Sequence, residues 1–191
     1  MKKLILISIL VLSFISCYSQ VVPLKSYDFP NGAYKQDLDL ELPFLEGTWE
    51  GIANNKKYTF IFTIFPHHLY WFSSDDYYYQ DVLVGKFKVT DLSTNQVLYD
   101  DTSVTNFDDY KILLLSIMLQ NDFSFAFFDT QEKCYNQLEF KLTKSNNNTN
   151  TITYHDFEYD TYLYQLNNCP YANQQDIPMF LPTTPLTLTK Q

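Results

Sequence analysis

Histidine and aspartate are the residues of this chain best suited to hold a metal ion or move a proton, and they occur in adjacent pairs. His67-His68 precedes Asp75-Asp76, and His155-Asp156 follows much later. Neighbours on an extended strand point to opposite faces of the sheet, so one segment cannot aim both rings at one ion. No cysteine or suitably spaced third ligand completes a zinc set. The sequence therefore predicts no metal site and no cofactor.

Two further aspartate pairs, Asp100-Asp101 and Asp108-Asp109, share one polar stretch but lack the glycine-centred loop of a calcium site. Nucleophilic catalysis needs a Ser, Thr or Cys poised by a histidine, and no nucleophile elbow is present. A catalytic pair of carboxylates, as in glycosidases, remains an alternative in so acidic a chain, although no inward-facing acid stands out. We therefore predict that the protein is not an enzyme.

The first 19 residues predict an export signal. Lys2 and Lys3 precede the apolar run Leu4–Ile15, and small residues follow it. The run is shorter than the ~20 apolar residues of a membrane span, so we expect no transmembrane segment. Cleavage after Ser19 would release a free protein, whereas cleavage before Cys17 would let its thiol carry a lipid anchor. Both routes stay open, and we expect a periplasmic, secreted or outer-membrane-associated protein.

Signal removal leaves Cys134 and Cys169 in an oxidising compartment, where an even pair predicts one disulfide. Two unpaired buried thiols are the alternative.

Charge excludes one large class of partner. The chain carries 22 Asp and Glu against 13 basic residues, and every basic residue is a lysine. An acidic surface without arginine repels phosphate backbones, so we expect no nucleic-acid partner. The lack of arginine, the usual bidentate phosphate clamp, also weakens any phosphoryl-transfer activity.

Period-two alternation of aromatic and polar residues predicts an all-β protein. In Lys57–Phe65 the side chains of Tyr58, Phe60 and Phe62 share one face, which is typical of a strand with one buried side. We expect Pro66 to end this strand and His68–Phe72 to form a short return strand.

Further strands are expected along the chain, with Gly85 as a bend and with a hairpin at Asn121-Asp122. They cover the following ranges: Leu45–Ile52, Tyr77–Val89, Val97–Tyr99, Lys111–Leu119, Phe123–Phe127, Tyr135–Thr143, Thr151–Phe157, Tyr162–Leu166 and Leu186–Thr189.

These strands divide the chain and set its architecture. Residues 1–19 form the signal, residues 20–42 an irregular leader with one or two helical turns within Tyr34–Leu42, and residues 43–191 a single domain. About eight to ten short strands with sequential turns favour an antiparallel meander closed into a β-barrel, with a β-sandwich as the alternative.

The abundant aromatic residues suggest two functions. A small apolar or glycan ligand could bind inside the barrel, where Trp49, Tyr58, Phe60 and Phe62 are the candidate binding residues. Tyr77–Tyr79 and a later series at Tyr154, Tyr159, Tyr162 and Tyr164 could form an aromatic platform, although strand packing also explains them. The alternative is a cell-envelope or surface interaction protein, such as a lipoprotein, without a small ligand.

Two resemblances accompany these predictions. Gly47-Thr48-Trp49 at the first strand resembles the Gly-x-Trp start of lipocalin-like barrels, in which an arginine packs on the tryptophan; this chain has none. Most of residues 27–191 resembles an uncharacterised family of small secreted proteins from Bacteroidota, a domain of unknown function. The matching segments are Pro30–Tyr34, Leu45–Gly51, Leu83–Val89, Phe125–Phe127, Cys169–Tyr171 and Leu186–Lys190. This resemblance implies export from a Gram-negative cell and no activity.

Overall fold

A computed structural model describes residues 20–118, 122–129, 134, 136–145, 150–160 and 169–191. The predicted signal, Cys17 and the predicted strand Tyr162–Leu166 lie outside these residues. The chain divides into two compact units. We call residues 20–39 and 66–81 the hairpin unit and residues 40–65 and 82–191 the barrel unit. No helix among the described residues is long and apolar enough to cross a membrane.

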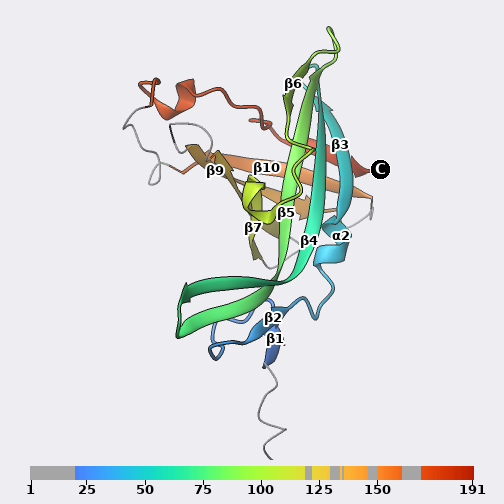
Figure 1. Ribbon diagram of the computed structural model, residues 1–191. Coiled ribbons are helices and arrows are strands. Elements are labelled where there is room, and N and C mark those ends of the chain that lie inside the picture. The colour runs from blue at the N-terminus through green and yellow to red at the C-terminus, as the bar shows by residue number, and fades with distance from the viewer. Residues whose placement is uncertain (1–19, 119–121, 130–133, 135, 146–149, 161–168) are drawn as a thin grey trace, which may run out of the picture. The chain divides into compact units, whose positions relative to one another are not determined.

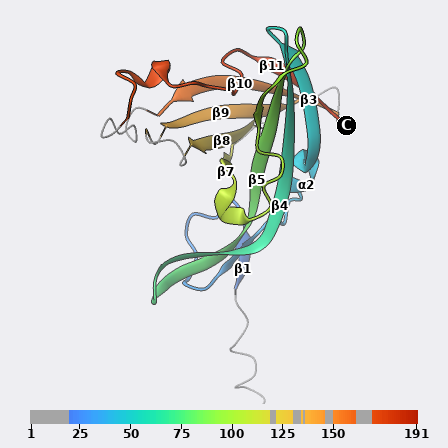
Figure 2. The ribbon, with the colours of Figure 1, turned by 45° about the horizontal axis from the view of Figure 1, so that its top comes forward.

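The barrel unit is a closed barrel of eight strands (Figures 1 and 2). Its strands, in the order in which they pair around the ring, are β5 (Asp76–Asp91), β4 (Lys56–Ser73), β3 (Gly47–Ala53), β11 (Leu186–Lys190), β10 (Thr151–Tyr159), β9 (Asn136–Lys144), β8 (Asp122–Asp129) and β7 (Ile112–Ile117). Antiparallel pairing of β7 with β5 closes the ring. The structure thus confirms the predicted all-β barrel, with β6 (Val97–Asp100) pairing to β5 outside the ring.

Side-chain alternation builds the core as the sequence predicted. In β4, Tyr58, Phe60 and Phe62 are buried while the residues between them are partly exposed. The turn before this strand is Asn54-Asn55, with φ angles of 50° and 60°. Positive φ at both central residues is the type I′ geometry that suits a two-residue hairpin and that asparagine tolerates.

The short helix α2 (Leu42–Leu45) and the end of β11 surround the buried Trp49. The indole nitrogen of Trp49 donates a hydrogen bond of 2.7 Å to the Leu45 carbonyl. Lys190 donates to the Phe44 carbonyl at 2.8 Å, and its ammonium lies 5.3 Å from the centre of a Trp49 ring. A lysine therefore supplies the cation on this tryptophan.

The end predicted at Pro66 is wrong, because β4 continues to Ser73 and includes the predicted return strand. Directly after the proline, His67 has a φ of 54°, and its backbone nitrogen donates to the Asp81 carboxylate at 3.1 Å. A side chain therefore satisfies the backbone donor that follows the proline, where the strand is irregular.

The hairpin unit holds the second part of β4, the first part of β5 and two short strands. These are β1 (Val21–Pro23) and β2 (Tyr34–Gln36), within the segment predicted to be an irregular leader. β1 pairs with β2, and β2 with β5, in parallel. The expected helical turn begins only at Leu42, in the barrel unit.

Two 3₁₀ turns complete the described elements. They are η1 (Phe107–Asp109) and η2 (Gln174–Asp176).

Candidate functional site

The four candidate ligand residues all lie in the barrel interior. Trp49, Tyr58, Phe60 and Phe62 are at most 4% exposed. Phe60 stacks on Phe62 with ring centres 6.2 Å apart, and Phe62 packs on Phe125 at 5.3 Å. These residues are therefore packed core, and ligand binding by them stays a prediction.

Stacked rings continue across the barrel interior from these residues. The ring of Phe125 stacks on Phe140 at 5.3 Å, and Phe140 stacks on Tyr154 at 4.8 Å. Phe60 also contacts Tyr154 and Phe87. Stacked aromatic side chains of the chain itself therefore occupy this part of the barrel interior.

Two buried polar side-chain atoms lack a hydrogen-bond partner among the described residues, the Nδ2 of Asn136 and the hydroxyl of Tyr154. The hydroxyl of Tyr154 is buried and forms no hydrogen bond to the described residues. Burial, with Tyr58 as a minor neighbour, raises the pKa of Tyr154 well above its ordinary value, so it stays neutral. A buried hydroxyl without a partner costs free energy, which makes this tyrosine a marker of whether the interior holds anything besides side chains.

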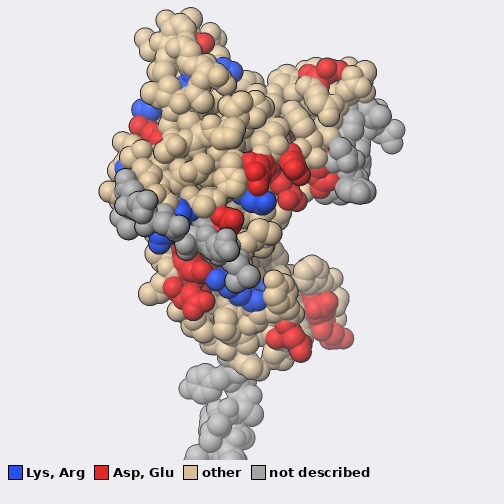
Figure 3. Space-filling model, turned by 180° about the vertical axis from the view of Figure 1, so that it is seen from behind, with Lys and Arg blue, Asp and Glu red and all other residues tan. Residues whose placement is uncertain are grey.

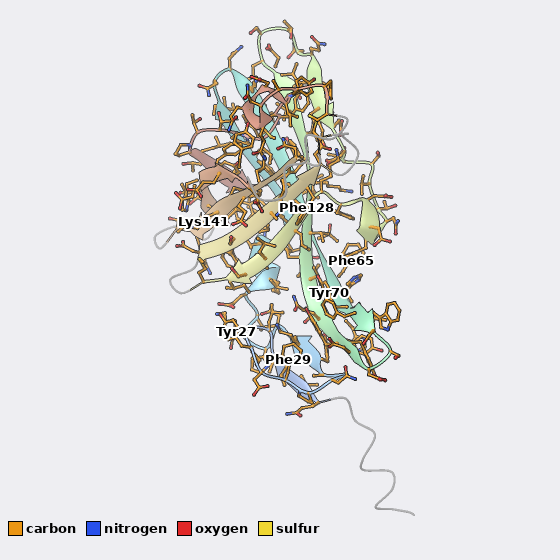
Figure 4. All side chains as sticks on the ribbon, turned by 90° about the vertical axis from the view of Figure 1, so that its left-hand side faces the viewer. Tyr27, Phe29, Phe65, Tyr70, Phe128 and Lys141 are labelled. Carbon is orange, nitrogen blue, oxygen red and sulfur yellow. A yellow bond between two sulfur atoms is a disulfide. The ribbon has the colours of Figure 1, made fainter. Side chains whose placement is uncertain are left out.

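A polar network on the outer wall of the barrel contains the predicted pair His155-Asp156. The Nδ1 of His155 lies 3.1 Å from Asp156, and its Nε2 lies 2.6 Å from the Thr143 hydroxyl. That hydroxyl donates to Asp122 at 2.5 Å. Lys141, which is labelled in Figure 4, pairs with Asp156 at 2.9 Å. The network joins β8, β9 and β10 through short polar contacts, which suits a structural role.

A hollow of about 140 Å³ lies beside this network, lined by Ser124, Glu139, Phe140, Lys141, Asp156 and Glu158. Among the described residues no group of three metal-ligating side chains is present, here or elsewhere.

A second polar cluster surrounds Tyr99 on β6. Its hydroxyl donates to Asp101 at 3.1 Å, and the other oxygen of Asp101 accepts from the Phe87 backbone nitrogen at 2.6 Å. Lys111 and Asp129 form a nearby ion pair of 2.7 Å that is largely shielded from solvent. Burial raises the pKa of Asp101, although the Phe87 and Tyr99 donors counteract part of this effect. All the polar groups of this cluster have partners, which suits a structural role.

The hairpin unit carries aromatic side chains on both faces of its sheet (Figure 4). On one face Tyr78 stacks on Tyr70 at 5.2 Å and packs against Phe29 at 5.0 Å. The ammonium of Lys35 lies 4.9 Å from the centre of the Phe29 ring. Burial, with a smaller contribution from Tyr78, raises the pKa of Tyr70 to about 12. This face is a neutral aromatic layer with one cation above it.

The other face continues the aromatic surface. His67 stacks on Tyr79 at 4.1 Å and meets the edge of Tyr34 at 4.6 Å. The predicted platform residues Tyr77–Tyr79 therefore divide between the two faces, as alternation along a strand requires. Tyr162 and Tyr164 of the later series lie outside the described residues.

Asp81 holds the hairpin unit together. Its carboxylate accepts a 2.5 Å hydrogen bond from the Tyr34 hydroxyl, one of 2.9 Å from the Asp37 backbone and the bond from His67. Burial and then the Asp81 carboxylate raise the pKa of Tyr34 to about 12. Sequence reasoning missed this residue, although a lone acid between Tyr77–Tyr79 and an apolar run was a usable signal.

Exposed apolar side chains concentrate in this small unit. Trp71 is 67% exposed, Phe72 65% and Leu69 46%. Half of the large apolar side chains exposed in the described chain belong to the hairpin unit, which is the smaller of the two. Sequence reasoning missed Trp71 and Phe72, because alternation alone does not show that a strand lacks a covering layer. They form the candidate binding surface.

The chain belongs to a family of unknown function, DUF6705, whose model matches residues 1–191. This confirms the expected membership of an uncharacterised family, while the bacterial origin and the lipocalin likeness stay predictions. No curated protein and no solved structure matches the chain.

Proposed function

We propose that this member of a family without an assigned activity is an exported interaction protein that binds its partner through the hairpin unit. The observation that carries the proposal is the exposure of Trp71 and Phe72, at 67% and 65%. Large apolar side chains that are exposed together on one strand of a protein in water mark an interaction site, and tryptophan is prominent in binding hot spots. We define the aromatic surface as Leu69, Trp71 and Phe72.

The packing of the barrel favours this surface over a ligand inside the barrel. Any ligand beside Phe60 and Phe62 would have to displace rings that already stack on one another. Such a core is close-packed, and opening a cavity in it costs stability. The interaction protein, the second function expected from the sequence, is therefore the better supported one.

Charge narrows the class of partner. The hairpin unit contains six aspartates and two lysines, and acidic side chains are conspicuous on the molecular surface (Figure 3). An anionic lipid surface would be repelled by this charge. A protein or a glycan of the cell envelope fits better.

Export is the second part of the proposal. The charged and apolar start of the chain supports it, and so do the sulfurs of Cys134 and Cys169, which lie 2.11 Å apart at the distance of a disulfide. Disulfides persist in the periplasm and outside the cell. The protein would act there, either free or anchored through Cys17.

Binding of labelled mature protein to washed envelopes of the cells that encode it tests the function. We expect saturable binding that is lost in the double variant Trp71→Ser, Phe72→Ser. The matched control is Ile52→Ser, which removes an apolar side chain of similar exposure, 64%, from the barrel unit. Equal binding by both variants would show that the aromatic surface does not carry the interaction. Treating the envelopes with protease or glycosidase separates the two kinds of partner.

A further inference from the structure

We infer that the partner presents an extended polypeptide strand with apolar and basic side chains, and that this strand pairs with the edge of β4 at Leu69–Ser73. The inference rests on the proposed function and names the chemistry of its partner.

Among the described residues, no strand pairs with the outer edge of β4 at Leu69–Ser73. Within the hairpin unit the sheet order is β1-β2-β5-β4, so β4 is the last strand. The pairing of β4 with β3 ends at Phe62, well before Leu69. An edge strand presents a row of backbone donors and acceptors, and an added strand is the ligand that satisfies them.

The edge of β4 at Leu69–Ser73 lacks the features that usually protect an edge strand. Natural edges are shielded by lysine, proline or bulges. Here Pro66 and the irregular His67 precede the edge, and Leu69–Ser73 contains no charge, proline or glycine. An exposed apolar edge of this kind in an exported protein is best explained by a partner that covers it.

The apolar side chains of this edge lie on both faces of the strand. Alternation along the strand places Leu69 and Trp71 on one face and Phe72 on the other. An added strand would lay its own alternating side chains beside both. Backbone hydrogen bonds would then supply affinity, and the aromatic rings would supply selectivity.

The tip of the hairpin beside this edge is acidic. Asp75 and Asp76 stand at the tip, next to the end of the edge, and are exposed. Neither forms an ion pair with a described residue. Opposite charge steers association and like charge opposes it. A basic strand is therefore favoured over a second copy of this acidic chain.

The test uses the full mature protein and a synthetic peptide of about eight residues that alternates valine and lysine. A second peptide carries methyl groups on alternate backbone nitrogens, and a third has glutamate in place of lysine. We expect calorimetry to show binding of the first peptide only, with slowed amide hydrogen exchange at Leu69–Ser73. We expect Leu69→Lys to weaken binding about tenfold or more. The control Leu38→Lys, which changes a 52% exposed side chain of the same unit outside the edge, should not.

Equal binding of the methylated peptide, or no binding of any peptide, would overturn strand pairing. Concentration-dependent dimers that Leu69→Lys abolishes would overturn the foreign partner in favour of a second copy. The proposed function is tested separately by envelope binding. If the double variant Trp71→Ser, Phe72→Ser loses envelope binding, the proposed function holds even when strand pairing or the foreign partner is overturned. If envelope binding never depended on Trp71 and Phe72, the proposed function fails separately.

Discussion

The stability effect of the Tyr154 hydroxyl can show whether a molecule is bound in the barrel interior. Replacing Tyr154 with Phe removes a buried polar atom without a described partner and keeps the ring that stacks on Phe140. We expect Tyr154→Phe to raise the free energy of unfolding by roughly 1 kcal/mol, or leave it unchanged. Urea denaturation measures this change.

Tyr58→Phe is the matched control, since it removes a hydroxyl from another buried ring. A loss of more than about 1 kcal/mol in Tyr154→Phe alone would mean that the hydroxyl has a partner in the folded protein. An internal water or a ligand would then be the next species to seek.

Single residues also mark where sequence reasoning succeeded. Tyr58, Phe60 and Phe62 were expected on one buried face, and they lie in the core, because burial follows directly from alternation. Asp81 was missed because its three hydrogen-bond donors come from distant parts of the chain. A contact of that kind leaves no local pattern.

At the scale of elements, Asp81 connects β2, β4 and β5 in the hairpin unit. Without its carboxylate the bonds from Tyr34, Asp37 and His67 are lost, and bonds to a charged acceptor contribute about 1.5–3 kcal/mol each. We expect Asp81→Ala to raise hydrogen exchange at least tenfold in the hairpin unit and to leave the barrel strands protected. Hydrogen-exchange mass spectrometry resolves the two units.

Asp75→Ala is the control for this prediction, because it removes an exposed acid from the hairpin tip. Faster exchange throughout the barrel in Asp81→Ala would contradict a role confined to the hairpin unit.

Strand boundaries were the weakest part of the prediction at this scale. Pro66 looked like an end, yet β4 passes through it, because the Asp81 carboxylate takes the His67 donor. β1 and β2 were unexpected, since three-residue strands are defined by their partners rather than by their own period. Whether an apolar strand is covered likewise depends on neighbours far along the sequence, as Trp71 and Phe72 show.

For the whole molecule, the pair Cys134 and Cys169 closes a loop of 35 residues. In the chain-entropy account a disulfide of this span stabilises the fold by about 3–4 kcal/mol. We expect the double variant Cys134→Ser, Cys169→Ser to lower the free energy of unfolding by about that amount. Urea titration measures it, and adding reductant to the unaltered protein should reproduce it.

The same reductant should leave the double variant unchanged. If wild-type protein takes up two alkyl groups without prior reduction, the two thiols are free and the sequence-based alternative of buried cysteines holds.

Barrel closure was predictable because many amphipathic strands in succession need a partner for every edge. The division of β4 and β5 between two units was not, since Pro66 and Asp81 mark single positions and do not show that a strand continues from one unit into another.

Because of that division, the residues of the hairpin unit could be exchanged without changing the sequence of the barrel unit. Along the sequence, residues 66–81 of the hairpin unit are inserted between Phe65 and Val82 of the barrel unit, and residues 20–39 precede the barrel unit. Members of the family could therefore differ in the partner they bind through substitutions in these two segments, while the sequence of the barrel unit stays the same. An engineer could graft a foreign hairpin at the same two junctions.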